Sequence, residues 1–173
     1  MISDLKSVFC FFIKKKELDF QMKIDTIDKK LLVLLQKDSK QTSKQLSLSL
    51  GLSVTAVYER VKKLEREGVI TKYVALLDKN KIGKSFLVFC HLKLEKHTKE
   101  NIVVFEREIN KLEEVIECFH VSGDYDYILK IYVKDMDEYR DFMVNKLTTL
   151  KHIASTHSTF TIGKVKNSSA IVL

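Results

Sequence analysis

The sequence predicts an α+β protein of two domains, because its hydrophobic periodicity changes near residue 80. Before that point, apolar residues recur at helical spacing in three short segments, the last two separated by a single glycine. Beyond it, strand-like and helix-like runs alternate in the order βαββαβ. A length of 173 residues suits two small domains, and 45% apolar with 31% charged residues is typical of soluble globular proteins.

The first predicted helix runs from Asp25 to about Lys37. Asp25 is a favourable N-cap, and Ile27, Leu31 and Leu34 fall on one face of the helix. We therefore expect this helix to pack on the two that follow it and to form a three-helix unit.

The second and third predicted helices are joined at Gly51, where a positive φ costs little. Thr42 and Gln45 have the spacing of a capping box at the start of the second helix, and Ser53 is a good N-cap for the third. The residues expected to face inward are Leu46, Leu50, Val57, Val61 and Leu64. This is the layout of a helix-turn-helix, whose last helix can enter a DNA major groove.

The outer face of the third helix is polar and basic, and it holds the candidate DNA contacts. These are Ser53, Thr55, Tyr58, Glu59, Arg60, Lys62 and Lys63. Thr55 and Glu59 are placed to reach base edges, where a glutamate accepts from a cytosine amine. Tyr58 and the two lysines suit phosphate contacts, which supply affinity without sequence information. Arg60 projects sideways, and a salt bridge that holds the helix is as good an interpretation as a phosphate contact.

The charge distribution indicates which half of the chain meets a polyanion. Residues 22–80 hold 12 basic and 7 acidic residues, a net charge of +5, whereas residues 81–173 hold 14 and 13. The pI of the chain is about 9.2. We therefore expect double-stranded DNA as a partner of the first domain. The alternative is that the helix pair is an ordinary structural hairpin with a solvated charged face.

Residues 1–21 precede the recognisable pattern and contain an apolar run, Val8–Ile13, that three lysines close. Six apolar residues are too few to span a membrane, and no signal-peptide cleavage site follows. Met22 comes immediately before the first helical pattern. We expect it to be the physiological start, with an extra element that docks on the body as the alternative.

The three cysteines, Cys10, Cys90 and Cys118, are far apart and have no CxxC spacing. This predicts a reduced, cytoplasmic location without a disulfide framework, and no zinc site or other cofactor.

An extended apolar segment, Val69–Leu77, follows Gly68 and suits a wing or a connecting strand. We therefore expect the first domain to be a winged helix-turn-helix. A polar break at 79–81 places the domain boundary there, between a DNA-binding domain of residues 22–80 and a second domain of residues 81–173. The chain has no proline and only five glycines, which argues against a long flexible linker.

The second domain is expected to be a ferredoxin-like βαββαβ fold. The predicted elements are a strand at Phe86–Leu94, a helix at Lys99–Leu112, strands at Val115–Val121 and Tyr127–Val133, a helix at Met136–Leu150 and a strand at Ala154–Val165. The residues predicted to be buried are Phe86, Val88, Cys90, Leu92, Leu94, Ile102, Phe105, Ile109, Met136, Tyr139, Met143 and Leu147.

The first strand of this domain is apolar on both faces, with Leu87 and Phe89 opposite Val88 and Cys90. In a ferredoxin-like fold both helices cover the same face of the sheet, so the other face is left open. Because an open face this apolar is unfavourable in water, we expect it to pair with a second copy of the chain.

Motifs along residues 22–173 resemble those of the Lrp/AsnC (feast/famine) family of prokaryotic transcription regulators. They are Ile24-Asp25-x-x-Asp28-x-x-Leu31-Leu32-x-x-Leu35-Gln36, Gly51-Leu52-Ser53, Arg60-Val61-x-x-Leu64-x-x-x-Gly68-Val69-Ile70, Val121-Ser122-Gly123-Asp124-Tyr125-Asp126-Tyr127, Met136-Asp137-x-Tyr139 and Val165-Lys166. The chain departs from the family pattern at Lys40, Ser47 and Lys79, and at Leu150–Ile153, where the usual Pro-Gly is missing.

The resemblance implies a sequence-specific regulator that forms dimers through its second domain and assembles further into tetramers or octamers. It also implies a small effector, typically an amino acid, bound between dimers near the Gly-Asp loop, which comprises residues 122–126. By position, the effector residues are Gly123, Asp124, Asp126, Met136, Thr159, Phe160 and Thr161. A glycine allows close approach of a ligand, and paired carboxylates suit an ammonium group. From the loop alone, an ordinary tight turn explains the two aspartates better.

Two other functions compete with this one. Some relatives of the fold are haem-pathway decarboxylases, and His91, His120 and His157 lie on predicted strands. However, no two of them have metal-ligand spacing, and the His-Asn-Tyr signature of those enzymes is absent, so we expect no enzyme activity. A sensor that has lost DNA binding would have a recognition helix depleted of basic residues, whereas this helix keeps four.

Overall fold

The computed structural model describes residues 24–173, and the predicted N-terminal extension, residues 1–21, lies outside them. The described chain divides into two compact units. The head comprises residues 24–74 together with the C-terminal tail, Ser168–Leu173, and the body comprises Ala75–Asn167. The sequence pattern placed a boundary near residue 80 and assigned the whole C-terminal part to the body, whereas the tail packs with the head.

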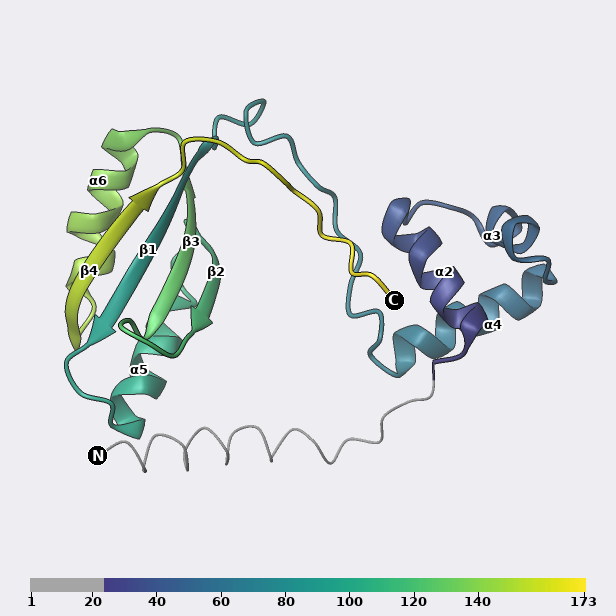
Figure 1. Ribbon diagram of the computed structural model, residues 1–173, viewed down its shortest axis with the longest axis horizontal. Coiled ribbons are helices and arrows are strands. Elements are labelled where there is room, and N and C mark those ends of the chain that lie inside the picture. The colour runs from purple at the N-terminus through teal and green to yellow at the C-terminus, as the bar shows by residue number, and fades with distance from the viewer. Residues whose placement is uncertain (1–23) are drawn as a thin grey trace. The chain divides into compact units, whose positions relative to one another are not determined.

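The head is a bundle of three helices, α2 (Thr26–Lys37), α3 (Ser43–Leu50) and α4 (Val54–Arg66) (Figure 1). Its small core consists of Leu31, Leu32, Leu46, Val57 and Leu64, all buried. The predicted helix-turn-helix is therefore confirmed, and its inward stripe is the predicted one, with Val61 packed at its edge.

Local capping explains why each helix of the head begins and ends where it does. Asp25 and Asp28 form a reciprocal capping box, in which the Asp28 N–H donates to Asp25 Oδ1 at 2.7 Å. Thr42 and Gln45 form a second capping box at the start of α3. Gly51 ends α3 with φ 66°, a left-handed conformation that glycine adopts without strain.

The segment predicted as a wing or connecting strand, Val69–Leu77, forms no strand, and residues 71–78 have no regular secondary structure. The physical reason is that a strand needs a partner for its backbone hydrogen bonds, and this segment pairs with no other strand of the described chain. Tyr73 instead donates its hydroxyl to Glu65 Oε1 at 3.0 Å, next to the end of α4.

The body contains one antiparallel sheet of four strands in the order β2-β3-β1-β4. The strands are β1 (Phe86–Leu94), β2 (Val115–His120), β3 (Tyr127–Val133) and β4 (Ile153–Phe160). Helices α5 (Lys99–Ile109) and α6 (Met136–Asn145) lie on one face of this sheet, and a 3₁₀ turn at Leu147–Thr149 follows α6 (Figure 1). The ferredoxin-like βαββαβ arrangement is thus confirmed.

The body core lies between the sheet and its two helices. It consists of Val88, Cys90, Leu92, Leu94, Phe105, Ile109, Tyr127, Leu129, Ile131, Val133, Tyr139, Phe142 and Leu147. One predicted core residue is wrong, since Met136 is 50% exposed. Met136 is the first residue of α6, and the inward stripe of that helix begins one turn later, where Tyr139 and Phe142 are buried.

Several elements are shorter than predicted. The last strand was expected to reach Val165 but ends at Phe160, because β1 begins at Phe86 and the final ladder bond joins the Thr161 N–H to the Leu87 carbonyl. Helix α6 ends at Asn145, since Lys146 leaves the helical conformation at φ −125°. Among the described residues, no helix is long and apolar enough to cross a membrane.

Candidate DNA-binding and effector surfaces

Helix α4 presents the predicted contact residues on the surface of the head. Val57 and Leu64 are fully buried and fix the rotation of the helix about its axis. The residues that consequently point outward and are exposed are Thr55, Tyr58, Glu59, Lys62 and Lys63. Ser53 caps the helix, with its Oγ accepting from the Ala56 N–H at 3.2 Å, and its hydroxyl proton is still available to a phosphate.

Arg60 does not point outward with the other basic residues. Its Nη1 lies 2.8 Å from Asp25 Oδ2 and 2.6 Å from Asp28 Oδ1, so it ties α4 to the first turn of α2. The hydrogen bond that Arg60 donates to Asp25 raises the pKa of Arg60. The pKa of Asp25 is lowered, first by the Asp28 backbone N–H and then by Arg60. Of the two interpretations that the sequence left open, the structure has the salt bridge.

The two neighbouring lysines of α4 differ in their surroundings. Lys62 pairs with Glu65 at 2.8 Å and lies 5.8 Å from the ring centroid of Tyr58. This hydrogen bond raises the pKa of Lys62 and lowers the pKa of Glu65. Lys63 has no acidic partner within 4.0 Å in the part of the chain that the structure describes. Within residues 24–173, Lys63 is therefore an ammonium group of this face that no neighbouring carboxylate neutralises.

The Gly-Asp loop lies between β2 and β3. Gly123 has φ 130°, a backbone conformation that side chains rarely adopt, and a Cβ there would meet nothing within 4 Å. Asp126 holds the loop to the end of β1, since its Oδ2 accepts from the Leu94 N–H at 2.7 Å. Its Oδ1 lies 2.7 Å from His97 Nε2. Asp124, in contrast, is exposed.

The remaining predicted effector residues lie at the opposite end of the sheet. The loop joins β1 at Leu92, whose carbonyl accepts from the Asp126 N–H, whereas Thr161 joins β1 at Leu87. Five residues of strand correspond to about 17 Å. Met136 also lies at the Thr161 end, because α6 follows the last residue of β3. One chain therefore does not bring the seven predicted residues together into one pocket.

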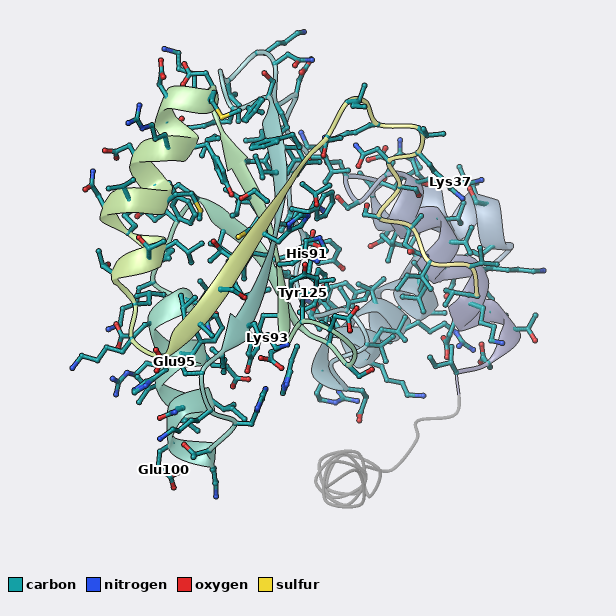
Figure 2. The ribbon with its side chains drawn as sticks, turned by 60° about the vertical axis from the view of Figure 1, so that its left-hand side comes forward. Lys37, His91, Lys93, Glu95, Glu100 and Tyr125 are labelled. Carbon is teal, nitrogen blue, oxygen red and sulfur yellow. The ribbon has the colours of Figure 1, made fainter. Side chains whose placement is uncertain are left out.

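The three strand histidines do not converge either. His91 and His157 are neighbours across β1 and β4, with ring centroids 6.0 Å apart, and Tyr125 lies 5.1 Å from His91. Figure 2 shows His91 and Tyr125 on the side of the sheet away from α5 and α6. His120 instead stacks on Tyr127, which faces the helices. In residues 24–173, no group of three or more His, Cys, Asp or Glu side chains is placed to hold a metal ion.

Two family models match the two units. Residues 24–71 match the winged helix-turn-helix DNA-binding model, and residues 87–171 match the Lrp/AsnC ligand binding domain. The leucine-responsive regulatory proteins of Escherichia coli (strain K12) and Salmonella typhimurium are each 39% identical over 150 residues, which is 87% of this chain and 92% of theirs. The chain belongs to the Lrp/AsnC family.

Solved Lrp/AsnC structures agree with this assignment. An AsnC family transcriptional regulator from Agrobacterium tumefaciens has a TM-score of 0.81 at 32% identity, over 85% of this chain and 95% of that one. A transcriptional regulator from Neisseria meningitidis, in complex with L-Met, has the same TM-score and coverage at 26% identity. The chain is thus a DNA-binding transcriptional regulator of the Lrp/AsnC type with a ligand-binding domain.

Sequence reasoning missed two features of these surfaces. The ring of Tyr125 lies beside both histidines of the open sheet face, whereas the sequence motif places Tyr125 only in the Gly-Asp loop. Gln36 binds the C-terminal tail, whereas the motif gives it no partner. The first needed the strand register and the second a contact across 135 residues of sequence.

Proposed function

We propose that this regulator reads its operator through Thr55 and Glu59, while Ser53, Tyr58, Lys62 and Lys63 contact phosphates. The observation that carries the proposal is the exposure of these side chains on one face of α4, whose opposite face is locked into the head by Val57 and Leu64. A recognition helix must be held rigidly if its side chains are to meet base edges.

We further propose that an amino acid is the effector. The structural relative from Neisseria meningitidis holds L-Met, and the body of this chain matches the ligand-binding model of the family. Gly123 and Asp124 lie at one end of the sheet, and Met136 and Thr161 lie at the other. A site that uses both groups therefore requires the loop of one copy to meet the opposite end of another copy. This requirement supports an effector site between protomers.

The same proposal includes a homodimer formed by the open faces of two sheets, and larger assemblies of such dimers. The open face carries Phe89, His91 and Ile128, which alternate with the buried residues of their strands. Phe119 on β2 is 49% exposed and pairs with Ile128. Burial of this surface against a second copy would remove apolar area from water, which is the main favourable term in association.

DNA fragments from the region upstream of its own gene would test the DNA proposal by fluorescence anisotropy. We expect binding that weakens steeply with salt, and the double variant T55A/E59A should lose discrimination between operator and random DNA while still binding both. The absence of measurable binding at low salt would support a sensor without DNA binding instead. A thermal-shift screen of the twenty amino acids would identify the effector, because a ligand of the folded state raises its melting temperature.

A further inference from the structure

Gln36, in the last turn of α2, holds one residue of the C-terminal tail by its backbone. Its Oε1 accepts from the Ile171 N–H at 2.6 Å, and its Nε2 donates to the Ile171 carbonyl at 3.0 Å. A side-chain amide that pairs with both backbone groups of one residue imitates the bonds of a neighbouring strand. The side-chain amide of Gln36 and the backbone of Ile171 thus each donate one hydrogen bond to the other and accept one from it.

The tail ends beside α2 (Figure 1), and its last residue, Leu173, forms one wall of a groove whose other walls belong to the head. The groove has a volume of about 420 Å³, and its lining includes Lys29, Lys30, Val33, Leu34 and Leu50 as well as Leu173. Leu173 is half covered there, at 48% exposure, whereas Val172 projects away at 97%. An apolar side chain on apolar walls, with two lysines nearby for the terminal carboxylate, suits a C-terminal peptide that ends in leucine.

The tail begins only a few residues after the sheet ends. Thr161 is the last residue bonded to β1, and Ile171 follows it ten residues later, a stretch that spans at most about 35 Å when fully extended. The chain therefore runs from body to head twice, once before β1 and once after β4. The second connection starts at Phe160 and Thr161, two of the proposed effector residues.

We propose that the groove on α2 and α3 is the receptor for the chain's own C-terminal tail, and that this docking is a second, detachable connection between body and head. A docked tail restrains the head, so a second head in a dimer finds its half-site at a higher effective concentration. The docking stands on the contacts above, whereas its effect on DNA affinity rests on the proposed function.

Hydrogen exchange of the full-length chain tests the docking. Gln36→Leu removes both hydrogen bonds, and Val172→Ser is the matched control because that side chain is exposed. We expect the peptide that contains residues 168–173 to exchange at least tenfold faster in the Gln36→Leu variant and at the wild-type rate in the control. Equal rates in all three proteins would overturn the docking. Protection that rises with protein concentration would assign the groove to the tail of another copy and would overturn the connection within one chain.

Anisotropy with the upstream DNA fragment tests the consequence. We expect Gln36→Leu, and a variant that lacks residues 170–173, to bind at least threefold more weakly than Val172→Ser. Equal affinities would overturn the coupling even if the exchange rates differ. If the wild-type chain binds no DNA, the proposed function fails and the coupling fails with it, while hydrogen exchange still decides whether the tail docks.

Discussion

Arg60 Nη1 lies 2.6 Å from Asp28 Oδ1, and the Asp28 side chain is only 2% exposed. This pair joins the middle of the recognition helix to the first turn of α2, where Asp25 completes the arrangement. A buried carboxylate without its partner is strongly destabilising. The orientation of the proposed DNA-reading face of α4 therefore depends on Arg60, a residue that pairs within the head.

Replacing Arg60 by methionine should destabilise the head by about 2–3 kcal/mol. This is less than the roughly 3–5 kcal/mol for breaking a fully buried pair, because Arg60 remains 30% exposed. Urea unfolding followed by circular dichroism measures this change. Arg66→Met is the matched control, since Arg66 is 71% exposed and, among the residues that the structure describes, pairs only with its neighbour Glu67. Its effect should stay within about 0.5 kcal/mol. Equal effects of the two substitutions would contradict the role assigned to Arg60.

Acid should weaken the head through Asp25. Its folded-state pKa is lowered by the Asp28 N–H and by Arg60, so the ionised form is favoured in the folded state. The resulting stability is complete above the unfolded pKa of about 3.9 and is lost as the pH falls through the lower folded value. Asp25→Asn keeps the N-cap, because asparagine is also a good N-cap residue. Between about pH 5 and pH 2, the range in which aspartate carboxylates ordinarily titrate, this variant should lose less stability than the wild type. Urea unfolding at several pH values measures this, with Glu59→Gln as the exposed control.

Lys63 should contribute more to DNA affinity than Lys62, although the two residues are adjacent. Glu65 already neutralises Lys62. We expect Lys63→Ala to reduce the slope of log K against log salt by about 1, and Lys62→Ala to reduce it by less. Glu65→Gln should increase the slope, because it frees Lys62. The assignment would be refuted by anisotropy titrations in which both lysine variants behave alike.

Gly123→Ala should cost about 1–3 kcal/mol although the new methyl group has room, because the cost comes from φ 130° and not from a clash. Gly163→Ala is the control, since it has equal space and no left-handed backbone, and it should be neutral or slightly stabilising. Thermal denaturation compares the two. A neutral Gly123→Ala would show that the loop relaxes into another conformation.

A charge on the open face of the sheet should separate the protomers. Phe89→Lys places an ammonium group there beside Lys130, its neighbour on β3. Val103→Lys places the same charge on α5, where Val103 is 54% exposed. Sedimentation velocity should show a smaller species only for Phe89→Lys. A dimer that survives this substitution would place the interface elsewhere.

Much of the fold was predictable because local signals agree with the tertiary structure. The capping residues Asp25, Thr42 and Ser53, the turn at Gly51 and the alternation along β1 each act within a few residues of sequence. The ends of elements were less predictable. The end of β4 depends on where β1 begins, and this is a contact across the sheet that no local pattern contains.

Helical and strand periods along the chain are enough to predict a capped helix-turn-helix ahead of a βαββαβ body, and to predict which side chains of α4 face outward. The partners of individual side chains follow from tertiary packing instead. It paired Arg60 with Asp28, separated Gly123 from Thr161 along the sheet, and seated Ile171 on Gln36. Each of these depends on segments that are far apart along the chain, and such contacts are set by packing, which periodicity does not encode.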